Sequence, residues 1–60
     1  MNKQPMVFEF KITSLKDGLF SLISFVHNNE QRALNRARRI GKDIYNTESL
    51  IIELLNEKPI

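Results

Sequence analysis

The residue types from which catalytic sites are built are scarce in this chain. Its one histidine is His27, and it contains no cysteine, so no thiolate nucleophile and no cysteine–histidine pair can form. We expect His27 to cap or pack against the end of a strand, opposite Phe8. Because nothing is available to partner its only imidazole, the chain is predicted to have no catalytic residues and not to be an enzyme.

The acidic residues and the glycines are poor candidates for holding a metal or a cofactor. Three glutamates, Glu48, Glu53 and Glu57, make the C-terminal segment acidic, but no histidine accompanies them at the spacing of metal ligands. The two glycines, Gly18 and Gly41, stand alone, whereas a phosphate-binding loop needs several glycines close together. We therefore predict neither a metal site nor a cofactor site.

Cationic side chains form the strongest candidate for a binding site. Arg32, Arg36 and Arg39 are spaced so that they lie on adjacent turns of a helix. Arginine binds phosphate or carboxylate groups through paired hydrogen bonds, and this spacing can follow a line of such groups. A solvated helix surface gives the same pattern, so both interpretations stay open. The residues predicted to bind a partner or nucleic acid are Arg32, Arg36, Arg38, Arg39 and Lys42.

These cations belong to residues 28–45, which have the pattern of an amphipathic helix. Asn28 is a suitable N-cap, and Gln31 three residues later can complete a capping box. Gly41 could end the helix, but the apolar stripe continues beyond it, so we expect an end near Tyr45 with Asn46 as the C-cap. The stripe recurs at helical spacing and consists of Ala33, Leu34, Ala37, Ile40, Ile44 and Tyr45.

The segment before the helix has the pattern of a β-hairpin. Residues 6–13 alternate between apolar and polar, and residues 19–27 form a second run rich in aromatic and β-branched residues. Asp17 and Gly18 tolerate the positive φ of a two-residue turn. With that turn the opposed pairs are Ile12 with Ile23, Phe10 with Phe25, and Phe8 with His27.

The hairpin face that the helix would leave uncovered is unusually apolar. In an antiparallel sheet with one face in water, that face is ordinarily polar. Here polar residues alternate with large apolar ones, and exposed apolar patches on small proteins often mark interfaces. We therefore predict a sheet-face interface at Val7, Leu15, Phe20, Leu22 and Val26, which Ile51 and Leu55 would extend.

The last segment, roughly residues 48–57, fits either a strand or a helix. As a strand it would direct Leu50, Ile52 and Leu54 inward. Its leucines and glutamates, however, intrinsically favour a helix. A two-stranded hairpin is marginal alone and gains stability from a third strand, which a crossover would place beside the first strand and parallel to the second. We predict an α+β fold of ββαβ type, with ββαα as the alternative.

Length and composition limit the chain to one small domain, residues 1–60, with residues 1–5 as a flexible N-terminal arm. No disulfide or metal stabilises it, and folded chains of this size often gain stability by oligomerising or docking on a partner. The longest apolar run is too short to cross a bilayer, and no signal peptide is visible. We therefore expect a cytoplasmic protein that does not bind membranes.

A hairpin, a covering helix with an "AL..A..I" stripe and a closing strand resemble many small proteins of phages and mobile elements. Some anti-CRISPR inhibitors are similar in size and in their ββαβ layout. The resemblance lies in the architecture, and no functional residue carries over. It implies a non-enzymatic binder that inhibits or modulates a host protein or nucleoprotein complex through surface charge and sheet edges.

Three hypotheses follow for the partner. The first is a larger protein or nucleoprotein complex, bound through the arginine face of the helix, the sheet, or both. The alternative is nucleic acid, bound directly by a small regulator through the arginine-rich helix. The third is a second copy of the chain, in a homodimer formed through the uncovered sheet face.

Overall fold

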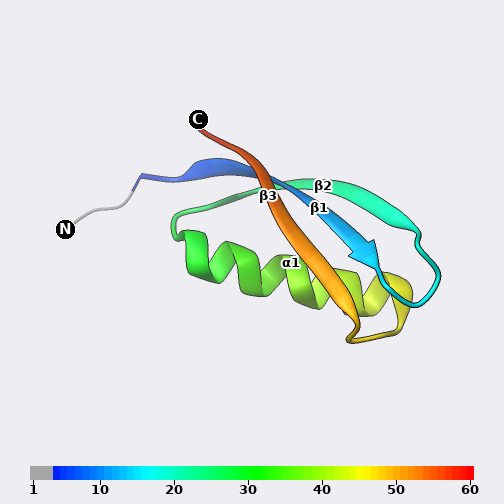
Figure 1. Ribbon diagram of the computed structural model, residues 1–60. Helices are drawn as coiled ribbons and strands as arrows, with labels where there is room; N and C mark the ends of the chain where they lie inside the picture. The colour runs from blue at the N-terminus through cyan, green and yellow to red at the C-terminus, as the bar shows by residue number, and fades with distance from the viewer. Residues whose placement is uncertain (1–3) are drawn as a thin grey trace.

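The computed structural model describes residues 4–60, which form three strands and one helix in the order ββαβ. The elements are β1 (Met6–Ser14), β2 (Phe20–His27), α1 (Glu30–Tyr45) and β3 (Leu50–Pro59). The strands make one layer and α1 lies against one face of it (Figure 1). The α+β fold predicted from the sequence is thus confirmed, and its last segment is a strand rather than a helix.

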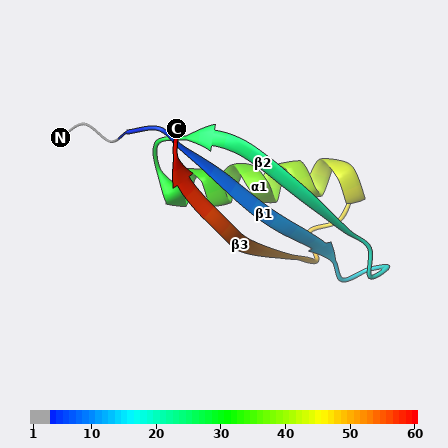
Figure 2. The same ribbon diagram turned by 90° about the horizontal axis from the view of Figure 1, so that it is seen from above.

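The sheet has the strand order β2-β1-β3, and β1 is antiparallel to both neighbours. β3 therefore lies beside β1 and runs parallel to β2, as the crossover argument predicts. Seen from above, the three strands pass diagonally over the helix, with β2 and β3 at the two edges (Figure 2). Of the predicted N-terminal arm, residues 1–3 lie outside the described residues, while Gln4 and Pro5 precede β1 and are exposed.

The predicted hairpin register is wrong by two residues. Phe8 pairs with Phe25, and Phe10 pairs with Ile23. The cause is the turn: the Ser14 amide donates to the Leu19 carbonyl at 2.8 Å, and the Gly18 amide donates to the Ser14 carbonyl at 2.8 Å. The loop therefore contains residues 15–18 rather than Asp17 and Gly18 alone, with Gly18 at φ 76°. A shift of two keeps every side chain on its predicted face, because side chains alternate with period two.

The predicted alternation of the last strand holds from Leu50 to Leu54 and is then interrupted by a bulge in β3. Glu9 pairs with Asn56 and Phe10 with Leu54, so Leu55 has no partner of its own. Leu50, Ile52 and Leu54 lie opposite the buried Ser14, Ile12 and Phe10, on the helix side as predicted, although Leu54 on this edge strand is 39% exposed. A bulge adds one residue to one strand, so every position beyond it changes face.

The helix begins one residue later than predicted. Its N-cap is Asn29, whose Oδ1 accepts a hydrogen bond from the Arg32 amide at 2.9 Å, so the assignment of Asn28 was wrong. Gln31 does not complete a capping box, since its amide donates to Asn35 instead. The predicted C-cap is confirmed: Asn46 has left-handed backbone angles, and its amide donates to the Lys42 carbonyl at 2.8 Å.

The core lies between the helix and β1. Its buried side chains are Phe8, Phe10, Ile12, Ala33, Ala37 and Leu50. On α1 the buried line is Ala33, Ala37 and Gly41, one residue per turn, while Leu34 and Ile40 flank it half-buried. Ile44, which was expected in the apolar stripe, is 50% exposed. Within residues 4–60, no helix is long and apolar enough to span a membrane.

Candidate interaction surfaces

The outer face is defined here as the side of the sheet that faces away from α1. Each of its rows crosses β2, β1 and β3 in turn, because the strands are in antiparallel register. The rows are Phe20–Thr13–Ile51, Leu22–Lys11–Glu53, Ser24–Glu9–Asn56 and Val26–Val7–Lys58. The large apolar residues are thus concentrated on β2 and at the hairpin end, while the centre of the face is polar.

The structure places most of the predicted interface residues on this face, and most of them are exposed. Phe20 is 57% exposed, Leu22 64% and Val26 53%. Val7 is half-buried, because it lies on the central strand between Val26 and Lys58. Leu15 is exposed in the hairpin loop rather than on a strand, and Ile51 and Leu55 are exposed on β3.

Two contacts fix the polar centre of the outer face. The Lys11 ammonium lies 4.7 Å from the centre of the Phe20 ring, a distance at which a cation is attracted to an aromatic face. The Asn56 amide donates to the Glu9 carboxylate at 3.1 Å. These polar groups therefore already have partners within the sheet.

Three of the predicted basic residues gather on the side of α1 nearest β2. Arg32, Arg36 and Arg39 line one shallow cavity of about 620 Å³ together with His27 at the end of β2. The Arg36 guanidinium lies 5.4 Å from the centre of the Phe25 ring, so this side chain covers part of the inner face of β2. One acidic residue, Asp43, also lines the cavity.

The other two predicted basic residues lie apart from that group. Arg38 and Lys42 line a second concave surface, which Arg39 shares with them. Lys42 also forms an exposed ion pair with Glu48, with 3.7 Å between Nζ and Oε1. The five cations therefore form two adjoining groups: the line of Arg32, Arg36 and Arg39 that the helical spacing predicts, and Arg38 with Lys42 beside it.

His27 stands at the end of β2, as predicted, but its neighbour differs. It opposes Met6 and not Phe8, because of the shifted register. Its Nδ1 accepts a hydrogen bond from the Asn28 amide at 3.0 Å, next to the start of the helix. The imidazole thus helps to end the strand.

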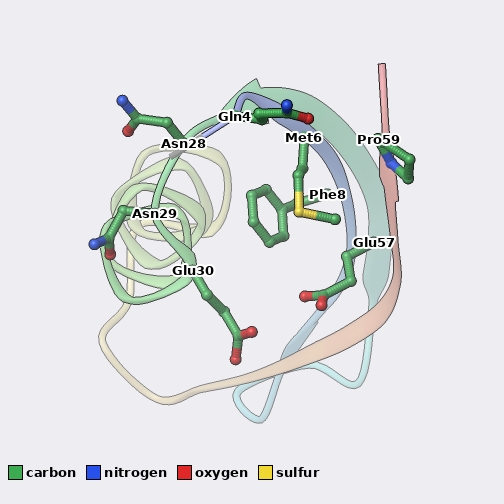
Figure 3. A pocket seen from close by; sticks show the side chains of 8 residues that line it. All are labelled: Gln4, Met6, Phe8, Asn28, Asn29, Glu30, Glu57 and Pro59. Carbon is green, nitrogen blue, oxygen red and sulfur yellow. The ribbon is translucent and has the colours of Figure 1, made fainter. Parts of the chain in front are cut away.

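The structure also contains a cavity that the sequence pattern did not reveal. It has a volume of about 460 Å³ and opens between the start of α1 and the ends of β1 and β3. Figure 3 shows Met6 and Phe8 within it, with Glu30 and Glu57 directed into it from opposite sides. Its lining residues are Gln4, Met6, Phe8, Asn28, Asn29, Glu30, Glu57 and Pro59.

The Glu30 carboxylate affects the ionisation of Glu57 at this cavity. Partial removal from water, a hydrogen bond shared with Glu30 and repulsion by the Glu30 charge together raise the pKa of the Glu57 carboxyl. Regular alternation from Ile51 would place Glu57 on the outer face, and the bulge at Leu55 turns it inward. Because no residue pattern announces the bulge, this pair could not be predicted from the sequence.

Among residues 4–60, no group of three or more histidine, cysteine, aspartate or glutamate side chains is arranged to hold a metal ion. Comparison of the chain with models of known families, with curated proteins and with solved structures gave no match.

Proposed function

We propose that this chain is a non-enzymatic interaction protein that binds a larger protein or nucleoprotein complex through the outer face of its sheet. The observation that carries the proposal is the set of large apolar side chains exposed there. Phe20, Leu22 and Val26 are each more than half exposed, and Ile51 and Leu55 add to them on β3.

The outer face departs from what contact with water alone requires. Three of the four outward positions of β2 are Phe20, Leu22 and Val26, where a solvated strand carries polar residues. Burying apolar surface contributes roughly 25 cal/mol per Å², so a partner covering several such side chains would gain several kcal/mol. The polar centre, with Glu9, Lys11 and Asn56, would supply specificity more than affinity.

The partner we propose is a host nucleoprotein complex, which the chain would inhibit or modulate. The ββαβ layout and small size, which resemble those of phage and mobile-element proteins including anti-CRISPR inhibitors, support this choice. The protein would act in the cytoplasm of the host, without a cofactor.

The test is co-elution with purified CRISPR effector complexes, using variants of the outer face that leave β2 intact. Ile51→Glu and Leu55→Glu each place a charge on an exposed position of β3 and should abolish co-elution. Ile44→Glu is the matched control, because Ile44 is 50% exposed and Ile51 45%, but Ile44 lies on the helix. Co-elution that survives both β3 changes would remove the outer face from the proposal, and failure of the wild type to co-elute with any complex would reject this partner class.

A second candidate function is direct nucleic-acid binding, which the cavity lined by Arg32, Arg36 and Arg39 favours. Three phosphate contacts on a duplex would give a slope of about −2.7 for the logarithm of affinity against the logarithm of salt concentration. A mobility-shift titration at several salt concentrations measures that slope. Reversing the three charges to glutamate should abolish binding, whereas no binding of the wild type at low salt would reject this function.

A further inference from the structure

The two edges of the sheet differ in their chemistry. β3 carries a bulge at Leu55 and ends in Glu57, Lys58 and Pro59, which are the features that keep an edge strand from pairing with another chain. β2 has none of them: from Phe20 to Val26 it contains no charged residue, no proline and no bulge. Figure 2 shows β2 along one side of the sheet and β3 along the other. Among residues 4–60, the features that protect an edge strand are found on β3 and not on β2.

β2 is also the least covered strand. It has no fully buried residue, whereas β1 buries Phe8, Phe10, Ile12 and Ser14. The helix packs mostly on β1 and β3 and least on β2. Ile23 and Phe25, which face the helix layer, are only half-buried. Apolar surface on both sides of β2 therefore lies next to its backbone edge.

The direction of the backbone groups on β2 follows from the hairpin. The Ser14 amide donates to the Leu19 carbonyl, so Leu19 directs its backbone groups toward β1. In an antiparallel ladder successive residues bond to opposite sides. The odd-numbered residues of β2 therefore bond to β1, and the backbone groups of Phe20, Leu22, Ser24 and Val26 point to the open edge. Within residues 4–60, β2 pairs with β1 alone.

We infer that β2 pairs antiparallel with β2 of a second copy of this chain, about a two-fold axis at Ile23, to form a continuous six-stranded sheet. This register pairs Phe20 with Val26 of the partner and Leu22 with Ser24, and so uses all four open backbone positions. If the register moved by two residues in either direction, some of these four backbone positions would have no partner on the other strand. Phe20 is aromatic and Val26 is β-branched, and a cross-strand pair of these two types stabilises antiparallel strands.

The choice of a second copy, rather than an unlike strand, rests on this self-complementarity and on charge. A strand from a different protein is commonly selected by opposite charges, and residues 20–26 contain no charged side chain. A domain of this size that has no cysteine, and so no disulfide, often gains stability from association. The inference is independent of the proposed function, because it uses the backbone edge of β2 and not the outer face.

The arginines set the salt dependence of this pairing. Arg32, Arg36 and Arg39 lie on the side of α1 nearest β2, so the two basic groups would face each other across the axis. Their repulsion opposes association and is screened by salt. Dimerisation should therefore become tighter as salt concentration rises, and a bound polyanion should have the same effect.

The first test is sedimentation equilibrium of the wild type and two variants from one row of the sheet. Ser24 on β2 and Asn56 on β3 both flank Glu9, so Ser24→Lys and Asn56→Lys add the same charge at opposite edges. We expect the wild type and Asn56→Lys to be dimers at micromolar concentration and Ser24→Lys to be a monomer. A monomeric wild type, or a dimer that survives Ser24→Lys, would overturn the inference.

The second test fixes the register and separates this dimer from one formed through the outer face. The side chain of Ile23 faces the helix layer, and Ile23 would meet its own copy in a non-hydrogen-bonded pair, where Cα atoms are about 4.5 Å apart. That spacing lies within the range of a disulfide. Because the chain has no cysteine, Ile23→Cys should give a clean cross-linked dimer on oxidation.

Leu22→Cys is the matched control for the cross-link, since Leu22 would meet Ser24 and not itself. A cross-link of Leu22→Cys with none of Ile23→Cys would contradict the register and the proposal. Leu22→Pro adds a check that does not introduce charge, because it removes an amide that points to the open edge and not to β1. Circular dichroism like that of the wild type, together with a monomeric mass, is the expected result for this variant; a dimer would overturn the inference.

Discussion

Gly41 of α1 lies against Ile12 of β1 so closely that a β-carbon at position 41 would come within 2.7 Å of the Ile12 Cγ2 atom. It would also lie 3.0 Å from Cδ1 of Leu50. Ile12 is fully buried, and its Cγ2 atom is attached to a branched β-carbon whose rotation is restricted. The residue that interrupts the helical pattern is therefore the one that lets the helix approach the sheet.

Gly41→Ala should destabilise the protein despite improving the helix. Alanine gains about 1 kcal/mol in helix propensity, whereas overpacking a core costs about 1–3 kcal/mol, so a net loss of up to about 2 kcal/mol is expected. Urea denaturation measures the difference. Asn35→Ala is the control, because Asn35 is exposed on the same helix: it loses a 3.4 Å hydrogen bond from Gln31 on the surface but creates no clash, and should therefore show a net gain from helix propensity. An equal gain at both positions would show that the backbone can move apart at Gly41.

Asn29→Ala should lower the free energy of unfolding by about 1 kcal/mol, because it removes the acceptor for the Arg32 amide at the start of α1. Asn28→Ala tests the specificity of this effect and should be close to neutral. Thermal denaturation of both variants checks the prediction. A larger loss at Asn28 would restore the cap position that the sequence pattern suggested.

Ser14→Ala should leave stability unchanged or raise it by about 1 kcal/mol, because an unpaired buried hydroxyl is costly. Ser14 is fully buried, and within residues 4–60 its Oγ has no hydrogen-bond partner. Ser21→Ala is the contrast, since the Ser21 hydroxyl bonds to the Tyr45 hydroxyl. Its loss should cost about 1 kcal/mol. Denaturant titrations that give the opposite ranking would refute this account.

Glu57→Gln should stabilise the protein at neutral pH. The pKa of Glu57 is raised in the folded state above its usual value of 4.5, so the folded state holds this proton more tightly than the unfolded chain. The wild type therefore loses stability as the pH rises from 4.5 through the raised pKa of Glu57. Glutamine at position 57 stays neutral and avoids this loss. Melting temperatures of variant and wild type should converge below the usual pKa.

Glu53→Gln provides the control for the pH experiment, since it removes the same charge from the same strand on the outer face. A pH-dependent difference from wild type that is as large for Glu53→Gln as for Glu57→Gln would show that net charge, and not the contact with Glu30, causes the effect.

Much of the fold could be predicted because it depends on local periodicity. Alternation in residues 6–13 places Phe8, Phe10 and Ile12 on the buried face, and this assignment survives the wrong register because a shift of two preserves the face. The apolar stripe places Ala33 and Ala37 against the sheet, and Asn46 ends the helix as expected. The fold class followed from these patterns and from the need of a hairpin for a third strand.

The candidate surfaces could be predicted less completely. The exposure of Phe20, Leu22 and Val26 follows from alternation, but the position of the arginine line next to β2 depends on how the helix lies over the sheet. The cavity between Glu30 and Glu57 depends on the bulge at Leu55, which has no local signal. The assignment of either surface to partner binding stays a prediction.

The sequence by itself determined which faces of β1 and α1 point to the core, where the helix ends and why catalysis is not expected, because composition and periodicity are properties of the chain alone. Tertiary structure decided the length of the turn, the bulge and the position of the helix over β1 and β3. It also decided that β2 is the open edge. These depend on contacts between residues far apart in the chain, such as Gly41 with Ile12 and Ser14 with Leu50, which no local pattern encodes.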